Sequence, residues 1–249
     1  MIKISSVNIF TSENAAVVEL STGKKYKILL KDYDNLPFVC KSGASLENII
    51  IDVQKAEEFE SNRFFDGDCV NFLRFLSRKY NIYNSALSKI VFTDMSRKQL
   101  YQKLYYAVMQ NQKKNNKIDT EPEELKDLCS LVCDEFERAG YINDKKYALD
   151  KAKYLKEYKK YGKNRIKEYL YQKGLPKAAI DEALEDEFFE DEDGDFENMF
   201  NFLSRKFRAG IDKTDRNAVS KAINMLSRNG YSYAQAKKAV TEFTDNQNG

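Results

Sequence analysis

Lysine, arginine and tyrosine side chains crowd the middle of this 249-residue chain, between residues 145 and 177. Lysine and arginine can neutralise phosphates, and tyrosine rings can stack on exposed bases. Such a surface can equally dock on an acidic groove of another protein, or its lysines can be ordinary solvated helix positions beside half-buried tyrosines. The basic side chains that we expect at an interface are Lys153, Lys156, Lys160, Lys163, Arg165, Lys167 and Lys173.

Catalytic and metal chemistry find little support in the sequence. The chain has no histidine, which removes the Ser-His-Asp and Cys-His arrangements and most zinc hydrolase sites. Cys129 and Cys133 share a helix face, but a metal would need further ligands, so these two, Cys40 and Cys69 are expected to be unreactive thiols. An enzyme that uses carboxylates and lysines is the least supported alternative, and we expect neither a cofactor nor a metal.

Three short helices are predicted to hold the basic stretch. Gly140, Gly162 and Gly174 each stand where a chain leaving a helix needs a positive φ. Asn143 or Asp144 can cap the first helix, because a short side-chain oxygen accepts from free amides of the first turn. The expected helices are 144–160, 163–173 and 176–186.

This central stretch resembles the core motif of the RecX family, which are bacterial regulators of the RecA recombinase. One difference is that Lys163 follows Gly162, where the family often has proline. The resemblance is carried by Gly140, Tyr141, Asp144, Tyr147 and Ala148, followed by Gly162, Arg165, Ile166, Leu170, Lys173 and Gly174.

The resemblance implies a non-enzymatic protein that binds the RecA–single-stranded DNA filament along its groove. It would inhibit the recombinase, ATPase and co-protease activities of RecA, in DNA repair and the SOS response. Its partners would be the RecA filament and single-stranded DNA, contacted directly or through the filament. The alternative is a RecA-independent helical-repeat protein that binds nucleic acid or acts as a scaffold. In either case we expect a cytoplasmic monomer without a membrane span, because no long apolar run is present.

The chain before the central stretch combines a small β-module with helices. Residues 2–30 alternate apolar and polar side chains, which predicts a three-stranded antiparallel meander with a hairpin turn at 21–24. Further helices are expected from Ser45, at 69–80 and at 85–92. Ser96 and Gln99 form a capping-box pattern at the start of the next helix, and a polar loop is expected at 110–120 before a helix at 122–139.

The pattern of the central helices recurs after residue 196. Ile166, Leu170, Ile180 and Leu184 align with Ala222, Leu226, Ala236 and Val240, and the helix that begins near Ser96 repeats the middle helix of the unit. A single short unit buries too little, so stacked neighbours are expected. The predicted fold is mainly α, with three tandem three-helix repeats in an elongated, curved solenoid. The predicted segments are the β-strand and helix module 1–60, a connecting helix 61–83, the repeats 84–139, 140–186 and 187–243, and a frayed tail 244–249.

An acidic run, Glu185–Glu197, follows the basic stretch. The plain interpretation is a solvated linker. The sharper one is that its carboxylates screen, or compete for, the neighbouring basic face.

Overall fold

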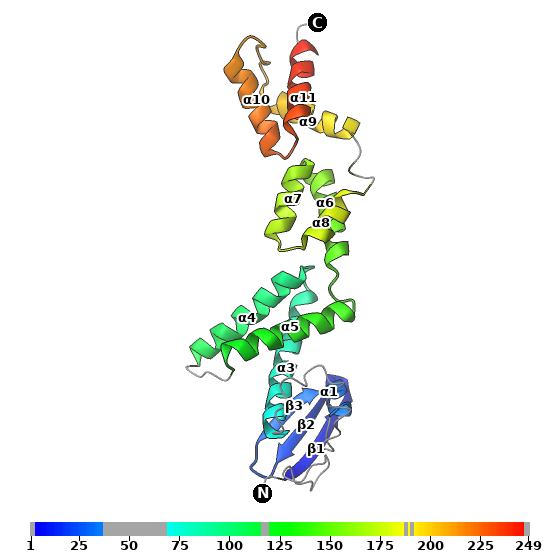
Figure 1. The fold of residues 1–249 in the computed structure, drawn as a ribbon, viewed down its shortest axis with the longest axis vertical. Helices are drawn as coiled ribbons and strands as arrows, with labels where there is room; N and C mark the ends of the chain where they lie inside the picture. The colour runs from blue at the N-terminus through cyan, green and yellow to red at the C-terminus, as the bar shows by residue number, and fades with distance from the viewer. Residues whose placement is uncertain (1–2, 37–68, 116–119, 187–188, 190–191, 247–249) are drawn as a thin grey trace. The chain divides into compact units, whose positions relative to one another are not determined.

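A computed structural model describes residues 3–36, 69–115, 120–186, 189 and 192–246 (Figure 1). The described chain is mainly helical with one small sheet, as predicted. Its contacts separate two compact units, each considered by itself. The first unit comprises Met1–Phe92 and Lys103–Glu135, and the second comprises Thr93–Gln102 and Phe136–Gly249. Cys40 and the helix predicted from Ser45 lie outside the described residues.

The sheet of the first unit is the predicted antiparallel meander. Its strands are β1 (Ile4–Phe10), β2 (Ala15–Leu20) and β3 (Lys25–Leu29), in the order β1-β2-β3. Gly23 takes a φ of 78° in the turn between β2 and β3. Alternate side chains of the strands are buried, including Val18 and Ile28, because helix α3 (Cys69–Ile90) packs against β3.

Helix α3 (Cys69–Ile90) corrects the prediction of two helices at 69–80 and 85–92. Its apolar face runs through the expected break, with Ile82 and Ala86 buried, and no glycine or proline interrupts it. The predicted segment boundary at residue 84 therefore falls inside a helix. Helix α4 (Arg97–Lys114) likewise continues into the residues predicted as a polar loop, and α5 (Pro122–Arg138) follows it.

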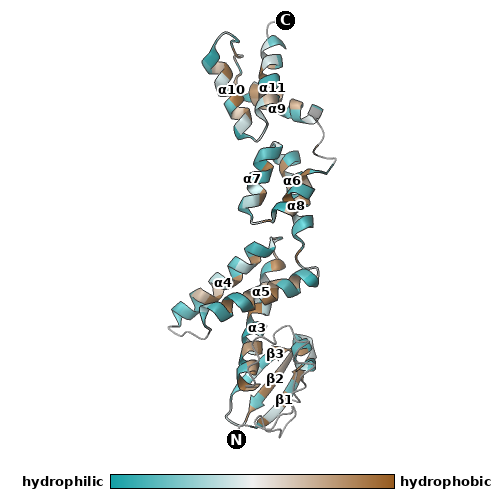
Figure 2. Cartoon of the chain, viewed as in Figure 1, coloured by the Kyte–Doolittle hydropathy of each residue, from teal (hydrophilic) through white to brown (hydrophobic). Residues whose placement is uncertain are grey.

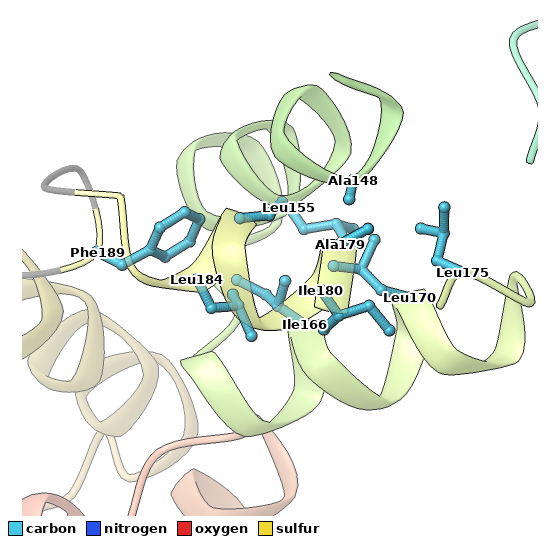
Figure 3. Close-up of a cluster of buried hydrophobic side chains, with 11 residues drawn as sticks. Ala148, Leu155, Ile166, Leu170, Leu175, Ala179, Ile180, Leu184 and Phe189 are labelled. Atoms are coloured by element: carbon cyan, nitrogen blue, oxygen red, sulfur yellow. The ribbon is translucent and has the colours of Figure 1, made fainter. Parts of the chain in front are cut away.

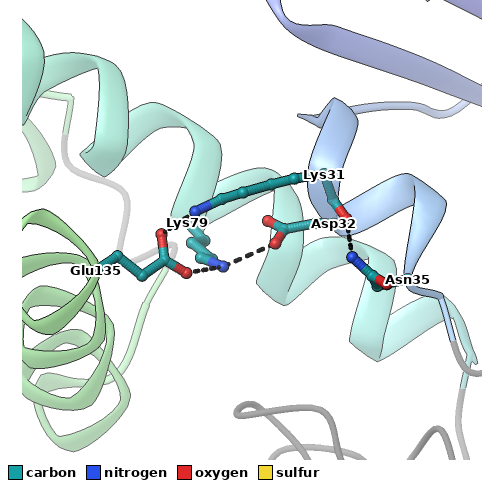
Figure 4. Close-up of polar contacts among 5 residues, drawn as sticks. All are labelled: Lys31, Asp32, Asn35, Lys79 and Glu135. Atoms are coloured by element: carbon teal, nitrogen blue, oxygen red, sulfur yellow. Dashed lines mark hydrogen bonds and ion pairs between the residues drawn. The ribbon is translucent and has the colours of Figure 1, made fainter. Parts of the chain in front are cut away.

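A buried ion cluster connects three helices of the first unit (Figure 4). The Lys79 ammonium on α3 lies 2.9 Å from an Asp32 carboxylate oxygen on α1 (Leu30–Asp34) and 2.5 Å from Glu135 on α5. Lys31 binds the other Glu135 oxygen at 2.8 Å. Burial raises the pKa of Asp32. Burial by itself would lower the pKa of Lys79, but the two carboxylates outweigh it, so that pKa is also raised.

The second unit contains two three-helix bundles, each with its own core (Figures 2 and 3). The three central helices have nearly their predicted bounds, and Asn143 is the residue that caps the first of them. The expected fraying from residue 244 is wrong as far as Asn246, because these residues are helical and Thr244 is buried. The helices are α6 (Asp144–Lys159), α7 (Lys163–Gln172), α8 (Lys177–Leu184), α9 (Glu192–Lys206), α10 (Arg216–Arg228) and α11 (Tyr233–Asn246).

The internal repeat is reproduced in the two cores. All eight side chains aligned between 166–184 and 222–240 are buried. Gly174 and Gly230 end the middle helices α7 and α10 in the same way, with positive φ values of 77° and 97°. The division into six segments and the elongated, curved shape stay predictions.

The described cysteines fit the expectation of unreactive thiols. Cys69, Cys129 and Cys133 are buried, and none of these three described cysteines is in a disulfide. Burial, with a smaller effect from the neighbouring Cys133, raises the pKa of Cys129 to about 12. A thiol that stays protonated is a poor nucleophile.

Candidate functional site

Motif residues take part in two contacts within the second unit, which we call joints. In each joint, the N-terminus of one helix meets the turn that follows another helix. At the first joint, the N-terminus of α4 meets the turn after α7. The Ser96 hydroxyl donates to the carbonyl oxygen of Lys173 at 2.7 Å, and an Asp144 carboxylate oxygen accepts from the Arg97 amide at 2.8 Å. Ser96 and Gln99 also form the predicted capping box. Asp144 therefore caps α4, a helix far from it in the sequence, rather than its own helix.

At the second joint, the N-terminus of α7 meets the turn after α10. The amide of Gly162 donates to the carbonyl oxygen of Asn229 at 2.8 Å, and the amide of Asn164 donates to that of Gly230 at 3.0 Å. A Cβ atom on Gly162 would lie 2.5 Å from the carbonyl carbon of Gly230. Only glycine permits this approach of the two backbones.

Other motif residues support the central bundle and the end of the helix before it. Ile166 and Leu170 are fully buried in its core, and Tyr147 packs against that core (Figure 3 shows the first two). Gly140 ends α5 with a φ of 76°, and the Tyr141 ring lies 5.4 Å from that of Phe136. The residues that carry the family resemblance thus lie in the core of the central bundle and at its contacts with neighbouring helices.

Three of the predicted interface lysines are engaged by carboxylates. Lys153 lies 3.1 Å from Asp186, and Lys167 lies 2.7 Å from Asp181. Lys156 is buried, 3.7 Å from Asp195. This burial leaves Lys156 little surface to offer a partner, and its place at an interface stays a prediction.

Arg165 and Lys173 belong to the joints. The Arg165 guanidinium donates to the side-chain oxygen of Asn229 at 2.8 Å, and its central carbon lies 3.9 Å from the centre of the Tyr161 ring. Lys173 supplies the carbonyl that Ser96 binds, and its ammonium lies 5.1 Å from the centre of the Tyr169 ring. Both side chains have structural contacts that a purely surface role does not require.

Lys160 and Lys163 remain exposed on the turn between α6 and α7, beside the exposed Lys159. Lys160 ends α6 with a φ of 56°, and its carbonyl oxygen accepts from the Tyr231 hydroxyl at 2.9 Å. The second joint thereby fixes the backbone of the turn. The exposed ring of Tyr158 lies one turn earlier, with its centre 5.2 Å from that of the Tyr154 ring and its plane tilted by 31°. We call Tyr158, Lys159, Lys160 and Lys163 the basic turn.

Sequence reasoning missed the acids that neutralise the other lysines. Asp181 and Glu182 lie on α8, and Asp186 and Asp195 lie in the acidic run, so all come later in the chain than α6. The acidic run does engage basic side chains, as its sharper interpretation proposed. The remaining basic turn is a cationic and aromatic surface suited to binding an anionic partner.

The described residues were also compared with the requirements of a metal site and of a membrane span. Where the chain is described, no three histidine, cysteine, aspartate or glutamate side chains gather as a metal site would require. None of the helices in the described ranges is long and apolar enough to cross a membrane.

Comparison with known proteins points to one family. Residues 143–184 match the model of the RecX second three-helix domain. The regulatory protein RecX of Clostridioides difficile (strain 630) is 29% identical over 160 residues, which is 64% of this chain and 66% of that protein.

Two solved structures share the fold. A crystal structure of regulatory protein RecX aligns with a TM-score of 0.65 at 14% identity, covering 97% of this chain and all of the other. The crystal structure of RecX from Lactobacillus salivarius aligns with a TM-score of 0.52 at 21% identity, covering 66% of this chain and 96% of the other. The resemblance predicted from the central motif is confirmed.

Proposed function

We propose that this chain, whose central three-helix domain matches the RecX second-domain model, is a non-enzymatic regulator of the RecA–single-stranded DNA filament. The observation that carries this proposal is the basic turn, which lies inside the matched domain and presents cations that have no acidic partner among the described residues. A filament offers both acidic protein surface and DNA phosphates to such a turn.

The mechanism that we propose is steric and electrostatic, and it needs no catalytic residue. Bundles joined in series would follow the filament groove and bridge successive RecA subunits. That placement would obstruct an incoming duplex or a repressor awaiting cleavage, or favour filament disassembly. The activity would lower recombination, ATP hydrolysis and co-protease action, and it would operate in the cytoplasm during DNA repair and the SOS response.

The test compares two charge-reversed variants in filament binding. Lys160→Glu/Lys163→Glu reverses the basic turn without touching Arg165, whose guanidinium supports the second joint. Lys221→Glu/Lys237→Glu makes the same charge change at exposed positions of the bundle formed by α9, α10 and α11. We expect the first variant to weaken binding to RecA-coated single strands by about tenfold, and the second by about twofold or less.

Two controls make the outcome specific. The same proteins are measured on bare single-stranded DNA, because equal affinity for bare strands and filaments would favour the RecA-independent alternative. Salt titration then separates the contacts. If the turn binds phosphates, the variant's salt slope falls by about two. Unchanged filament binding by the Lys160→Glu/Lys163→Glu variant would refute the role of the basic turn.

A further inference from the structure

The first unit contains a cavity that the proposed function does not use. Its volume is about 600 Å³, and it is bounded by the β2–β3 hairpin, α3 and α4. Lys24 and Lys25 reach it from the hairpin, Arg74 and Arg78 from α3, and Asn111 from α4. Binding sites for small organic ligands commonly have volumes of about 300–1,000 Å³.

The charge on the cavity wall has one sign. Four cationic side chains line it, and no carboxylate does so among the described residues. Of the four, Arg78 is neutralised by Glu124, whose oxygens lie 2.6 and 2.7 Å from its Nη1. Lys25 has a looser partner, Glu19, at 3.6 Å, and its own side chain is 63% exposed.

Two cations that line the cavity come from different elements, and neither has an acidic partner in the part of the chain that the structure describes. Lys24 is exposed on the hairpin. Arg74 is exposed on α3, and its Nη1 donates to the neutral side-chain oxygen of Asn71 at 2.8 Å. A ligand between the hairpin and α3 would therefore meet positive charge from both sides, and it must carry negative charge to offset their mutual repulsion.

The rest of the wall is mixed in a way that suits a nucleotide. Ser77, Asn81 and Ser85 follow one another at four-residue intervals on α3 and can donate hydrogen bonds. The apolar contribution comes from Ile82 on α3 and Val108 on α4. A phosphate fits the cationic rim because arginine presents several donors to its oxygens, and an apolar wall can cover a base.

We propose that this cavity binds the phosphate group of a nucleotide, with Lys24, Lys25 and Arg74 as the phosphate-binding side chains. The nucleotide can be free, or it can be one residue of a single strand, since both present the same group. The site is distinct from the basic turn. It assigns a binding role to the β-module and its helices.

The experiment measures two probes with the full chain. A fluorescent ADP analogue represents the free nucleotide, and a short fluorescein-labelled oligothymidylate represents the strand. Lys25→Glu/Arg74→Glu reverses the rim, and we expect it to weaken binding of the responsive probe by about tenfold. Lys221→Glu/Lys237→Glu carries the same charge change elsewhere, and we expect it to change binding by about twofold or less.

A second variant tests the cavity without changing its charge. Ala107 is exposed on α4 and lines the cavity, so Ala107→Trp should fill it while leaving the fold intact. Its circular dichroism spectrum should match that of the parent protein, and its affinity for the responsive probe should fall by about tenfold or more.

The outcomes decide the proposal. A response with both probes supports free nucleotides, and a response with the oligonucleotide alone supports a strand. No binding of either probe, or equal binding by the rim, cavity and control variants, overturns the inference. Lys160→Glu/Lys163→Glu enters the same assay. If oligonucleotide binding is lost in Lys160→Glu/Lys163→Glu but kept in the rim and cavity variants, the cavity is excluded as the binding site. The proposed function is then still supported.

Discussion

The two joints of the second unit place the same kind of helix end on the same kind of turn, but they do so with different atoms. At the α7–α10 joint, backbone meets backbone through Gly162 and Gly230. At the α4–α7 joint, side chains of Ser96 and Asp144 make the connections, and only Gly174 approaches closely. The α7–α10 joint therefore depends on two facing glycines, with Arg165 and Tyr231 adding side-chain bonds, whereas the α4–α7 joint depends on side chains for its connections.

This difference determines how each joint responds to change. A Cβ on Gly230 would lie 2.4 Å from the Arg165 amide nitrogen, which cannot move without moving α7. A Cβ on Gly174 would instead meet the side chain of Lys98 at 2.6 Å, and that chain can rotate away. We expect the α7–α10 joint, the backbone joint, not to tolerate a side chain in place of its glycines. We expect the α4–α7 joint, the side-chain joint, to tolerate such a substitution but to depend on pH.

The largest expected effects come from the glycines of the backbone joint. Gly162→Ala should cost about 1–3 kcal/mol by overpacking alone, because Gly162 has an ordinary φ of −73°. Gly230→Ala should lower the free energy of unfolding by about 1–2 kcal/mol more than Gly162→Ala does, because an alanine at a φ of 97° adds backbone strain. Urea unfolding measures both free energies, and hydrogen exchange at the Asn164 amide reports the joint itself.

Gly140 and Gly174 are the matched controls for these substitutions. Gly140 has a φ of 76° and open space around its missing Cβ, so Gly140→Ala isolates the backbone strain of about 1–2 kcal/mol. Gly174→Ala should cost little more than that. If Gly162→Ala proves no more damaging than a surface substitution, the close approach at the backbone joint is wrong.

Removing one hydroxyl from each joint should have intermediate effects. Ser96→Ala removes both the helix cap and the bond to Lys173, and should cost about 1–2 kcal/mol. Tyr231→Phe removes only the bond to the Lys160 carbonyl, and should cost about 1 kcal/mol. Thermal unfolding measures the stability of the two variants, and Ser96→Ala should be the less stable. A larger loss for Tyr231→Phe would reverse the assignment of side-chain and backbone joints.

The smallest expected effect is a pH dependence confined to the side-chain joint. Burial raises the pKa of Asp144 above its ordinary value of 3.8, although the Arg97 amide partly opposes this. The folded protein then binds a proton more tightly than the unfolded one, so stability falls as pH rises from the ordinary value through the raised one. Asp144→Asn keeps an acceptor for the amide and should flatten this slope.

Stability measured against pH checks this sign. The free energy of unfolding of the parent protein, relative to that of Asp144→Asn, should fall as pH rises from the ordinary pKa through the raised one. Above that window the difference should stay constant. Asp144→Ala lacks the acceptor and should be less stable than Asp144→Asn at every pH. A difference that shifts in the opposite direction would contradict the burial of Asp144.

The central bundle could be predicted from the sequence because its signals are local. Glycine, proline and capping residues fix the ends of α6, α7 and α8 within a few positions, and the buried residues follow helical spacing. The joints could not be predicted, because their partners are 47 to 77 residues apart. Nothing at Ser96 indicates that its hydroxyl binds Lys173.

The site was predicted less well for the same reason. Lys156 and Lys160 are one helical turn apart and look alike in the sequence, yet one is buried beside Asp195 and the other is exposed. The distinction depends on where the acidic run folds, which helical periodicity does not encode. The break expected between residues 80 and 85 failed because buried Ile82 continues the apolar face of α3.

The measurement that tests the proposed function most directly is the DNA-dependent ATP hydrolysis of RecA, titrated with this protein well below the RecA concentration. A filament-directed regulator should lower the rate at a small fraction of one molecule per RecA, because one bound copy affects several subunits. No change in the rate, even with this protein in excess over RecA, would contradict the proposed function.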